Sequence, residues 1–331
     1  MTHPIGLQIT GVGRFLPDRV ITSAELEDRF DLRRGSIERK LGVRERRWAE
    51  PPINSSQMGA AAAREALEMA GLRPKDLDLI INSSGTQHRL IPDGGPILQQ
   101  ELGIGDTGIP SFSVHSTCLS FLTSIELSAY LIASGRYRRI LIVSSENASI
   151  GLDFREPYVA ALFGDGAAAA VVEKPTTSQS GELLLTHFET YGEAYDLSTV
   201  RLGTERHPVR NGYDLSDAYF RMDGKKLYRS TIQRLGAFFE RLSPDWPEIA
   251  DKLSAVVSHQ TTRRGLYAIT RFGVRKEIVV NTLHKFGNCV AASIPMTLYE
   301  AIKCGAIRPG QTFLLCGTGA GLSIGAAVLR F

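Results

Sequence analysis

Three side chains that support nucleophilic chemistry occur far apart in the 331-residue chain: Cys118, His259 and Asn288. A cysteine thiolate attacks carbonyl carbons, and an imidazole moves protons. Imidazole and amide N–H groups can also donate hydrogen bonds to a developing oxyanion. The three residues therefore form a candidate set for acyl-transfer chemistry, provided that the fold brings them together.

The sequence around Cys118 predicts a strand-to-helix turn. An extended-looking run, Ile109 to His115, precedes the cysteine, and the apolar run Leu119 to Ala133 follows it with the character of a buried helix. Such a turn would place the sulfur at a helix N-terminus, where backbone N–H groups and the helix dipole favour a thiolate. Taken alone, Cys118 also fits a structural role, because free cysteine is among the most buried residue types.

The other two candidates also lie at predicted element ends. His259 ends the strand-like run Leu253 to Ser258, and Asn288 lies in a Gly-Asn turn before the apolar run Val290 to Ala301. Catalytic groups are often displayed at such ends, because loops positioned by a rigid scaffold carry much of protein function.

Composition is that of an ordinary globular protein, with 43% apolar and 22% charged residues. A net charge of +3 and a pI near 8.6 are compatible with an anionic ligand but too weak to indicate nucleic-acid binding. No signal-peptide pattern follows Met1, and apolar runs stop well short of the ~20 residues of a membrane span. We therefore expect a cytoplasmic protein with no membrane span.

Cysteine and histidine spacings do not predict a metal site. The four cysteines are Cys118, Cys289, Cys304 and Cys316, without a Cys-x-x-Cys pair. His115, three residues before Cys118, has no second ligand at a metal-like spacing. We expect neither a metal nor another cofactor, and Gly164-Asp-Gly166 lacks the spacing of a dinucleotide site.

Strands and helices alternate along most of the chain, which predicts an α/β fold. The expected elements of the first half are helix 55–70, strand 77–83, helix 96–102, strand 109–115, helix 119–133, strand 139–145 and a Gly turn leading into a strand that ends at 173. Those of the second half are strand 182–190, helix 225–242, strand 253–258, helix 263–272, strand 277–281, helix 291–304, strand 312–316 and a Gly turn into strand 322–331. Both halves end alike, which indicates an internal duplication.

Two segments interrupt this alternation. Pro175 to Gly181 is the predicted junction, which divides the chain into residues 1–176 and 177–331. The polar segment Asp196 to Asp223 has no clear periodicity, and we expect an excursion over the site or an interdomain cap.

These motifs together resemble the β-ketoacyl-acyl-carrier-protein synthase III type of condensing enzyme, within the thiolase superfamily. The resemblance spans nearly the whole chain. Its motifs are the Cys118 turn, His259-Gln260, Gly287-Asn-Cys-Val-Ala-Ala-Ser-Ile-Pro295, Leu162-Phe-Gly-Asp-Gly-Ala-Ala168 and the C-terminal Gly-Leu-Ser-Ile-Gly-Ala-Ala-Val-Leu-Arg-Phe. It implies a five-layered α-β-α-β-α sandwich of two related halves, and a homodimer.

The resemblance also implies a reaction. An acyl thioester, on coenzyme A or an acyl carrier protein, would acylate Cys118. A malonyl thioester would then lose CO2 to give an enolate held by His259 and Asn288, and the enolate carbon would attack the acyl group. Backbone N–H groups of Cys118 and Ala320 would form the second oxyanion hole. The product would be a β-ketoacyl thioester for fatty acid or specialised-metabolite biosynthesis.

Four further residues are implied in substrate binding. Lys40 falls where the family often has Arg, and Arg229 and Arg264 align with basic positions near the phosphopantetheine entrance or the carrier-protein surface. A solvated helix face is the alternative for these two arginines. Ile91 aligns with the residue that reaches across the dimer to close the partner's acyl pocket.

Several alternatives remain open at this stage. Acyl transfer to a non-malonyl oxygen or nitrogen acceptor would use the same acylation step. Non-decarboxylative head-to-head condensation is disfavoured because Ile91 stands where some such relatives have a catalytic Glu. Cys316 invites comparison with true thiolases, but its offset of one residue favours a buried, inert thiol. A papain-like protease fits the separation of Cys118 and His259 but lacks the signature, and a non-catalytic partner subunit would not need all three side chains.

Overall fold

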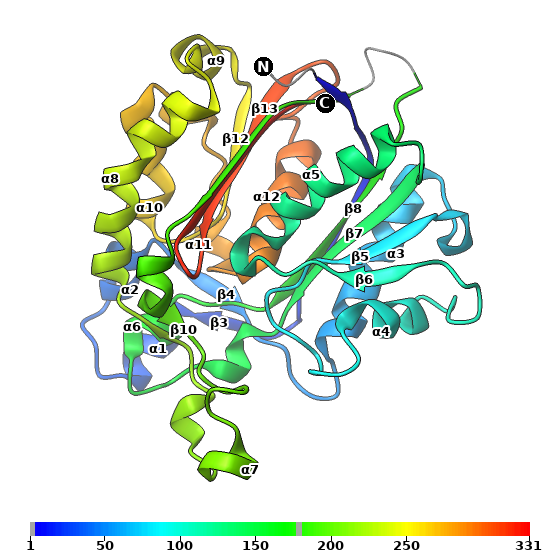
Figure 1. Ribbon diagram of the computed structural model, residues 1–331. Helices are drawn as coiled ribbons and strands as arrows, with labels where there is room; N and C mark the ends of the chain where they lie inside the picture. The colour runs from blue at the N-terminus through cyan, green and yellow to red at the C-terminus, as the bar shows by residue number, and fades with distance from the viewer. Residues whose placement is uncertain (1–3, 177–180) are drawn as a thin grey trace.

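The computed structural model describes residues 4–176 and 181–331, and its core is built on two five-stranded sheets (Figure 1). The first sheet has the order β2 (Gln8–Phe15), β8 (Gly166–Glu173), β7 (Arg139–Glu146), β5 (Leu79–Asn82), β6 (Ser111–Ser113). The second has the order β1 (Ile5–Gly6), β9 (Glu182–Thr190), β14 (Ser323–Arg330), β13 (Thr312–Gly319), β12 (Ala255–Ser258).

The strand directions confirm the predicted duplication. In the first sheet β8 pairs antiparallel with both β2 and β7, and β7 pairs parallel with β5. In the second sheet β14 pairs antiparallel with both β9 and β13, and β13 pairs parallel with β12. Four strands of one sheet therefore correspond to four strands of the other in order and in direction.

The predicted strand 277–281 is wrong. This segment forms a short 3-10 helix, Lys276–Ile278, and a single parallel bridge between Val256 and Val279. The ladder stops there because the Gln260 side chain takes up the next free amides, accepting hydrogen bonds from the N–H groups of Thr282 and Leu283. β6 is the edge strand of the first sheet, and the segment at the corresponding position of the second sheet is a connection rather than a strand.

Alternating side chains on the buried strands produce five layers, as predicted. On β5, Leu79 and Ile81 face the central layer, whereas Ile80 faces the outer helices. The central layer holds α5 (Ser120–Ala133) and α12 (Ser293–Lys303), which pack between the two sheets. The outer layers are α3 (Ser55–Ala70) with α4 (Gly94–Glu101), and α8 (Gly224–Leu242) with α9 (Trp246–Lys252).

Most other predicted helices are present with small changes at their ends. The apolar run after Cys118 begins with a 3-10 turn, Thr117–Leu119, before α5, and 291–304 likewise begins with a 3-10 turn, Val290–Ala292, before α12. The predicted helix 263–272 divides into α10 (Arg263–Leu266) and the 3-10 helix Tyr267–Phe272. In the described parts of the chain, no helix has both the length and the apolar character that crossing a membrane requires.

Smaller elements complete the fold at the end of the sandwich where the site lies. They are β3 (Val20–Thr22), β4 (Glu45–Arg47), α1 (Ser23–Arg29), α2 (Ser36–Leu41), α6 (Pro157–Ala160) and α11 (Leu283–Phe286). The excursion 196–223 contains the hairpin strands β10 (Ser198–Thr199) and β11 (Arg221–Met222), with α7 (Pro208–Asn211) projecting from the body (Figure 1). The predicted junction includes residues 177–180, which lie outside the described residues, and the division at 176 stays a prediction.

Candidate active site

Cys118 lies in the single 3-10 turn between β6 and α5, so the sulfur is presented at the start of the central helix. The preceding residue, Thr117, has a φ of 50°, a left-handed conformation that is costly outside glycine. The turn is held by Ser120, whose Oγ accepts a hydrogen bond from the Ser116 N–H at 2.9 Å and donates one to the Thr117 carbonyl at 2.7 Å. These bonds fix the backbone on both sides of the cysteine.

The thiol of Cys118 is held in its protonated form. Burial and the nearby Glu146 carboxylate raise its pKa to about 12, although the backbone N–H groups of Ala320 and Cys118 act on the sulfur in the opposite direction. The expectation that the helix N-terminus would favour a thiolate is therefore wrong for the free protein, because desolvation outweighs the two amide dipoles. These two amides are the donors that the sequence predicts for the oxyanion hole, and both lie within hydrogen-bonding reach of the sulfur.

Glu146 is a buried carboxyl group that sequence reasoning missed. It ends β7 and accepts hydrogen bonds from the Gly85 N–H at 2.5 Å and from the Thr86 N–H and hydroxyl at 2.7 Å each. A further backbone hydrogen bond comes from Ala291, and burial raises the pKa of the carboxyl to about 7. Glu146 thus joins the 85–86 loop to the turn that carries Asn288. The signal in the sequence that could have identified it is a carboxylate at the end of a buried apolar strand, because a buried charge needs a special environment.

His259 follows β12 and is 4% exposed. Its backbone N–H bonds to the Cys316 carbonyl at 2.9 Å, and its Nδ1 has no hydrogen-bond partner among the described residues. Burial lowers the pKa of the imidazole to about 4, so the ring is neutral at physiological pH. A neutral imidazole has one nitrogen that accepts a proton and one that donates a hydrogen bond.

Asn288 is buried in a turn whose backbone is tied to the first half. Its N–H bonds to the Leu162 carbonyl at 2.9 Å, and its carbonyl accepts from the Gly164 N–H at 3.1 Å. Its side-chain Oδ1 accepts from the Val290 N–H at 2.9 Å. Because this bond occupies the amide oxygen, the Nδ2 group is the part of the side chain available as a donor.

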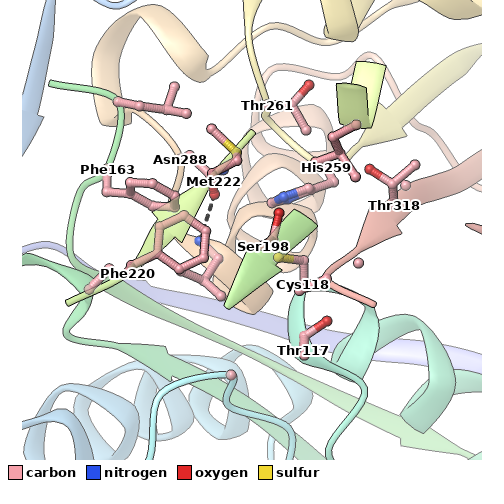
Figure 2. A pocket seen from close by; sticks show the side chains of 18 of the residues that line it. Thr117, Cys118, Phe163, Ser198, Phe220, Met222, His259, Thr261, Asn288 and Thr318 are labelled. Carbon is pink, nitrogen blue, oxygen red and sulfur yellow. Dashed lines mark hydrogen bonds between the residues drawn. The ribbon is translucent and has the colours of Figure 1, made fainter. Parts of the chain in front are cut away.

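One cavity of about 1030 Å³ brings Cys118, His259 and Asn288 together (Figure 2). The loops of the first half, the C-terminal loop with Ala320, the excursion and α8 all contribute to its walls. The sequence-predicted set of three reactive residues therefore converges on one apolar-walled space, at the ends of corresponding elements of the two halves.

The described lining of this cavity includes none of the four predicted substrate-binding residues. Arg264 is exposed and stacks over the ring of Tyr228, 4.5 Å from its centroid, and Tyr228 lines the cavity. Lys40 Nζ lies 3.1 Å from the centroid of Tyr158. Arg229 is exposed on α8, and Ile91 is 89% exposed. Their roles toward substrate stay predictions.

The remaining thiols lie outside the turn that carries Cys118. Cys316 lies on β13, packs in the apolar cluster under α8 and also borders the cavity, and burial raises its pKa to about 12. Cys289 is buried with a raised pKa, and Cys304 is exposed. Among the described residues, no three His, Cys, Asp or Glu side chains are arranged to hold a metal ion.

Two family profiles match the chain. Residues 112–192 match 3-oxoacyl-[acyl-carrier-protein] synthase III, and residues 249–331 match the C-terminal part of the same enzyme. The β-ketoacyl-[acyl-carrier-protein] synthase III 3 of Streptomyces coelicolor is 34% identical, over 98% of this chain and 96% of the relative.

Solved structures agree with the sequence comparison. The 3-oxoacyl-[acyl-carrier-protein] synthase III of Aquifex aeolicus superposes with a TM-score of 0.89 at 29% identity, covering 98% of this chain and all of the other. The priming β-ketosynthase of the R1128 polyketide pathway has a TM-score of 0.88 at 28% identity, covering 100% of this chain and 98% of the other.

Fold and site together define a thiolase-type condensing enzyme. The chain belongs to the β-ketoacyl-acyl-carrier-protein synthase III family. This membership confirms the predicted resemblance and the acyltransferase class, and it excludes a papain-like protease.

Proposed function

We propose that Cys118, His259 and Asn288 carry out decarboxylative condensation of an acyl thioester with a malonyl thioester. The observation that carries this proposal is the convergence of a protonated thiol, a neutral imidazole and an amide donor on one cavity. Decarboxylation is accelerated by hydrogen-bond donors preorganised toward the enolate oxygen, and His259 and Asn288 can both act as donors.

The first half-reaction acylates the cysteine. The His259 imidazole accepts the Cys118 proton as sulfur attacks the donor carbonyl, and the Cys118 and Ala320 N–H groups stabilise the tetrahedral oxyanion. The bond between the acyl carbon and the donor sulfur then breaks. The proton on His259 passes to the leaving thiolate, which leaves the acyl group on Cys118 and a neutral imidazole.

The second half-reaction forms the carbon–carbon bond. Loss of CO2 from the malonyl group leaves an enolate, whose oxygen accepts hydrogen bonds from His259 and from Asn288 Nδ2. The enolate carbon attacks the acyl carbonyl, Cys118 sulfur leaves, and a proton from solvent restores the thiol. Burial keeps the His259 ring neutral, and a neutral imidazole still has one N–H that can donate to the enolate oxygen.

We further propose that the substrates arrive on coenzyme A or acyl carrier protein and that the enzyme is a cytoplasmic homodimer. Exposed Arg229 and the Arg264–Tyr228 contact near the cavity support docking of an anionic carrier.

The proposed dimer is supported by two exposed apolar side chains. Leu90 and Ile91 are 78% and 89% accessible, which favours a subunit contact at the 85–92 loop. Free cysteines support a reducing compartment. Sedimentation of the wild type and of Ile91→Glu would test the dimer, which we expect the charge to weaken.

Intact-protein mass spectrometry tests the reaction. Wild type and Cys118→Ala are incubated with a panel of acyl-coenzyme A and acyl-carrier-protein donors, then with malonyl carrier protein. We expect an adduct on wild type alone, which disappears with release of CO2. An adduct that malonyl carrier leaves in place would indicate transfer to an oxygen or nitrogen acceptor instead, and absence of any adduct would indicate a non-catalytic subunit.

A further inference from the structure

The cavity around Cys118 is lined by apolar side chains, by Ser, Thr, Asn, Gln, Tyr and Cys side chains, and by the three histidines His88, His115 and His259. Within the described residues, its lining includes no Asp, Glu, Lys or Arg. A carboxylate or ammonium group on a bound acyl chain would lose its hydration there without gaining a counter-charge, which is strongly unfavourable. The acyl chain that the donor transfers to Cys118 is therefore uncharged, whereas the malonyl carboxylate does not persist in this space because it leaves as CO2.

One wall of this cavity is formed by the excursion and its neighbours. Ser198 on β10 pairs directly with Met222 on β11, so the two side chains share one face of the hairpin and both line the cavity. Phe163 and Phe220 stand beside them in an edge-to-face contact, with ring centroids 5.0 Å apart. Figure 2 shows the Ser198 side chain pointing into the space onto which Cys118 also opens.

The hydroxyl group of Ser198 is a buried polar group without a hydrogen bond to the described residues, in a wall that is otherwise mostly apolar. The residue is only 7% exposed, and within residues 4–176 and 181–331 its Oγ finds no hydrogen-bond partner. Other buried serines, such as Ser120 and Ser124, donate to a nearby carbonyl, whereas the unpaired Ser198 hydroxyl borders the cavity, where a ligand could pair with it. Water can satisfy this hydroxyl while the cavity is empty, but an acyl chain that displaces the water must replace its hydrogen bond or leave the group unpaired.

Two other unpaired hydroxyls that border the cavity occupy different surroundings. The Oγ1 of Thr117 lies against Gly319, where an added Cβ would come within 2.7 Å of it. Ser258 directly precedes His259 on the C-terminal sheet. Ser198 differs from both because it lies on the excursion, where Met222 and Phe220 also line the cavity.

We propose that the acyl donor carries a neutral oxygen function, a hydroxyl or keto group, that hydrogen-bonds to Ser198. A buried polar group built to bond a substrate oxygen discriminates strongly against the hydrocarbon analogue, because that analogue leaves the group unpaired. Ser198 is thus a specificity-determining residue for the donor. This inference rests on the proposed acylation of Cys118 and adds the chemical class of the acyl group.

The test measures the rate of Cys118 acylation by intact mass spectrometry, with coenzyme A thioesters of one six-carbon chain. The donors are hexanoyl, 2-hydroxyhexanoyl, 3-hydroxyhexanoyl and 3-oxohexanoyl, and the proteins are wild type, Ser198→Ala and Ser128→Ala. Ser128 is the matched control, because its hydroxyl in α5 is also buried and unpartnered among the described residues but does not border the cavity.

We expect wild type to prefer at least one oxygenated donor over hexanoyl by about tenfold or more, the effect of one hydrogen bond left unmade. Ser198→Ala should lose most of this preference by slowing with the oxygenated donor while hexanoyl is unchanged or faster. Ser128→Ala should keep the wild-type ratio. Acylation of wild type at equal rates by all four donors, or a ratio unchanged by Ser198→Ala, overturns the inference while leaving the proposed function intact. Absence of an adduct with every donor, on coenzyme A and on acyl carrier protein alike, in a protein whose thiol still reacts with iodoacetamide, overturns the proposed function itself.

Discussion

Thr117 and Val290 occupy corresponding positions in the two halves and share an unusual backbone conformation, with φ values of 50° and 45°. Each begins a 3-10 turn that leads into a central helix. Each turn is held in the same way: Ser120 Oγ accepts from the N–H two residues before Cys118, and Ser293 Oγ accepts from the Cys289 N–H at 3.0 Å. The duplication therefore extends to the hydrogen bonds that set the nucleophile and the Asn288 turn.

This correspondence predicts that Ser120→Ala and Ser293→Ala separate the two half-reactions. Loss of the Ser120 bonds loosens the turn that presents Cys118, so acylation should slow by about tenfold. Loss of the Ser293 bond loosens the turn after Asn288, so CO2 release should slow by a similar factor while acylation stays near wild type. Single-turnover adduct formation and malonyl decarboxylation measure the two steps.

Each variant serves as the control for the other, because both delete the hydroxyl of the first residue of a central helix, which accepts a hydrogen bond from the preceding turn. Both should also lower the free energy of unfolding by about 1 kcal/mol, measured by urea denaturation. Parallel losses in both half-reactions for each variant would contradict the prediction and indicate general loosening of the central layer.

The protonated Cys118 thiol predicts slow alkylation at neutral pH. Because burial and Glu146 raise its pKa to about 12, the iodoacetamide rate should still rise with pH through pH 9. Peptide mapping separates Cys118 from the exposed Cys304, which acts as an internal reference with ordinary exposure. A plateau below pH 7 would contradict the prediction, because it would reveal a thiolate paired with a charged imidazole.

Glu146 predicts opposite effects on reactivity and stability. Glu146→Gln removes the charge that raises the Cys118 pKa, so alkylation at pH 8 should be faster than in wild type. The same change places an NH2 group against the N–H donor of either Gly85 or Thr86, which should lower the free energy of unfolding by about 1–3 kcal/mol. Urea denaturation and alkylation kinetics check the two parts. An unchanged alkylation rate in a folded variant would show that the Glu146 charge does not affect the pKa of Cys118.

Much of the fold could be predicted from the sequence because buried strands and helices leave strong periodic patterns. Helix 55–70 has the predicted bounds, since Asn54 and Gln57 form a capping box at its start and Gly71 ends it. The segment 277–281 has an equally apolar pattern but is not a strand. The Gln260 side chain bonds the backbone N–H of Thr282 and so competes with strand pairing in this segment. A local sequence pattern does not contain such an interaction with a residue elsewhere in the chain.

The reactive residues could be predicted because residue type and position at element ends are visible in the sequence. The protonation state of Cys118 could not be, since it depends on burial and on a carboxylate 28 residues away. Ser198 was missed for a related reason. A serine in a polar excursion looks solvated until the hairpin with Met222 places it in a buried wall.

The neutral His259 predicts a loss of stability in acid. Burial lowers the folded-state pKa to about 4, below the ordinary value of 6.5, so the unfolded chain binds the extra proton between these two values. The stabilising contribution is therefore present above pH 6.5 and is lost as the pH falls toward 4, by up to about 3 kcal/mol.

The Glu146 carboxyl titrates in the opposite sense, so the experiment must separate the two groups. Its raised pKa gives stability below pH 4.5 that is lost as the pH rises through about 7. The comparison of wild type with His259→Asn in urea at pH 7, 5.5 and 4.5 isolates the histidine, because Glu146 is common to both. We expect the stability difference between the two proteins to shift toward the variant as the pH falls, and a difference that is constant with pH would show that the imidazole is not held neutral.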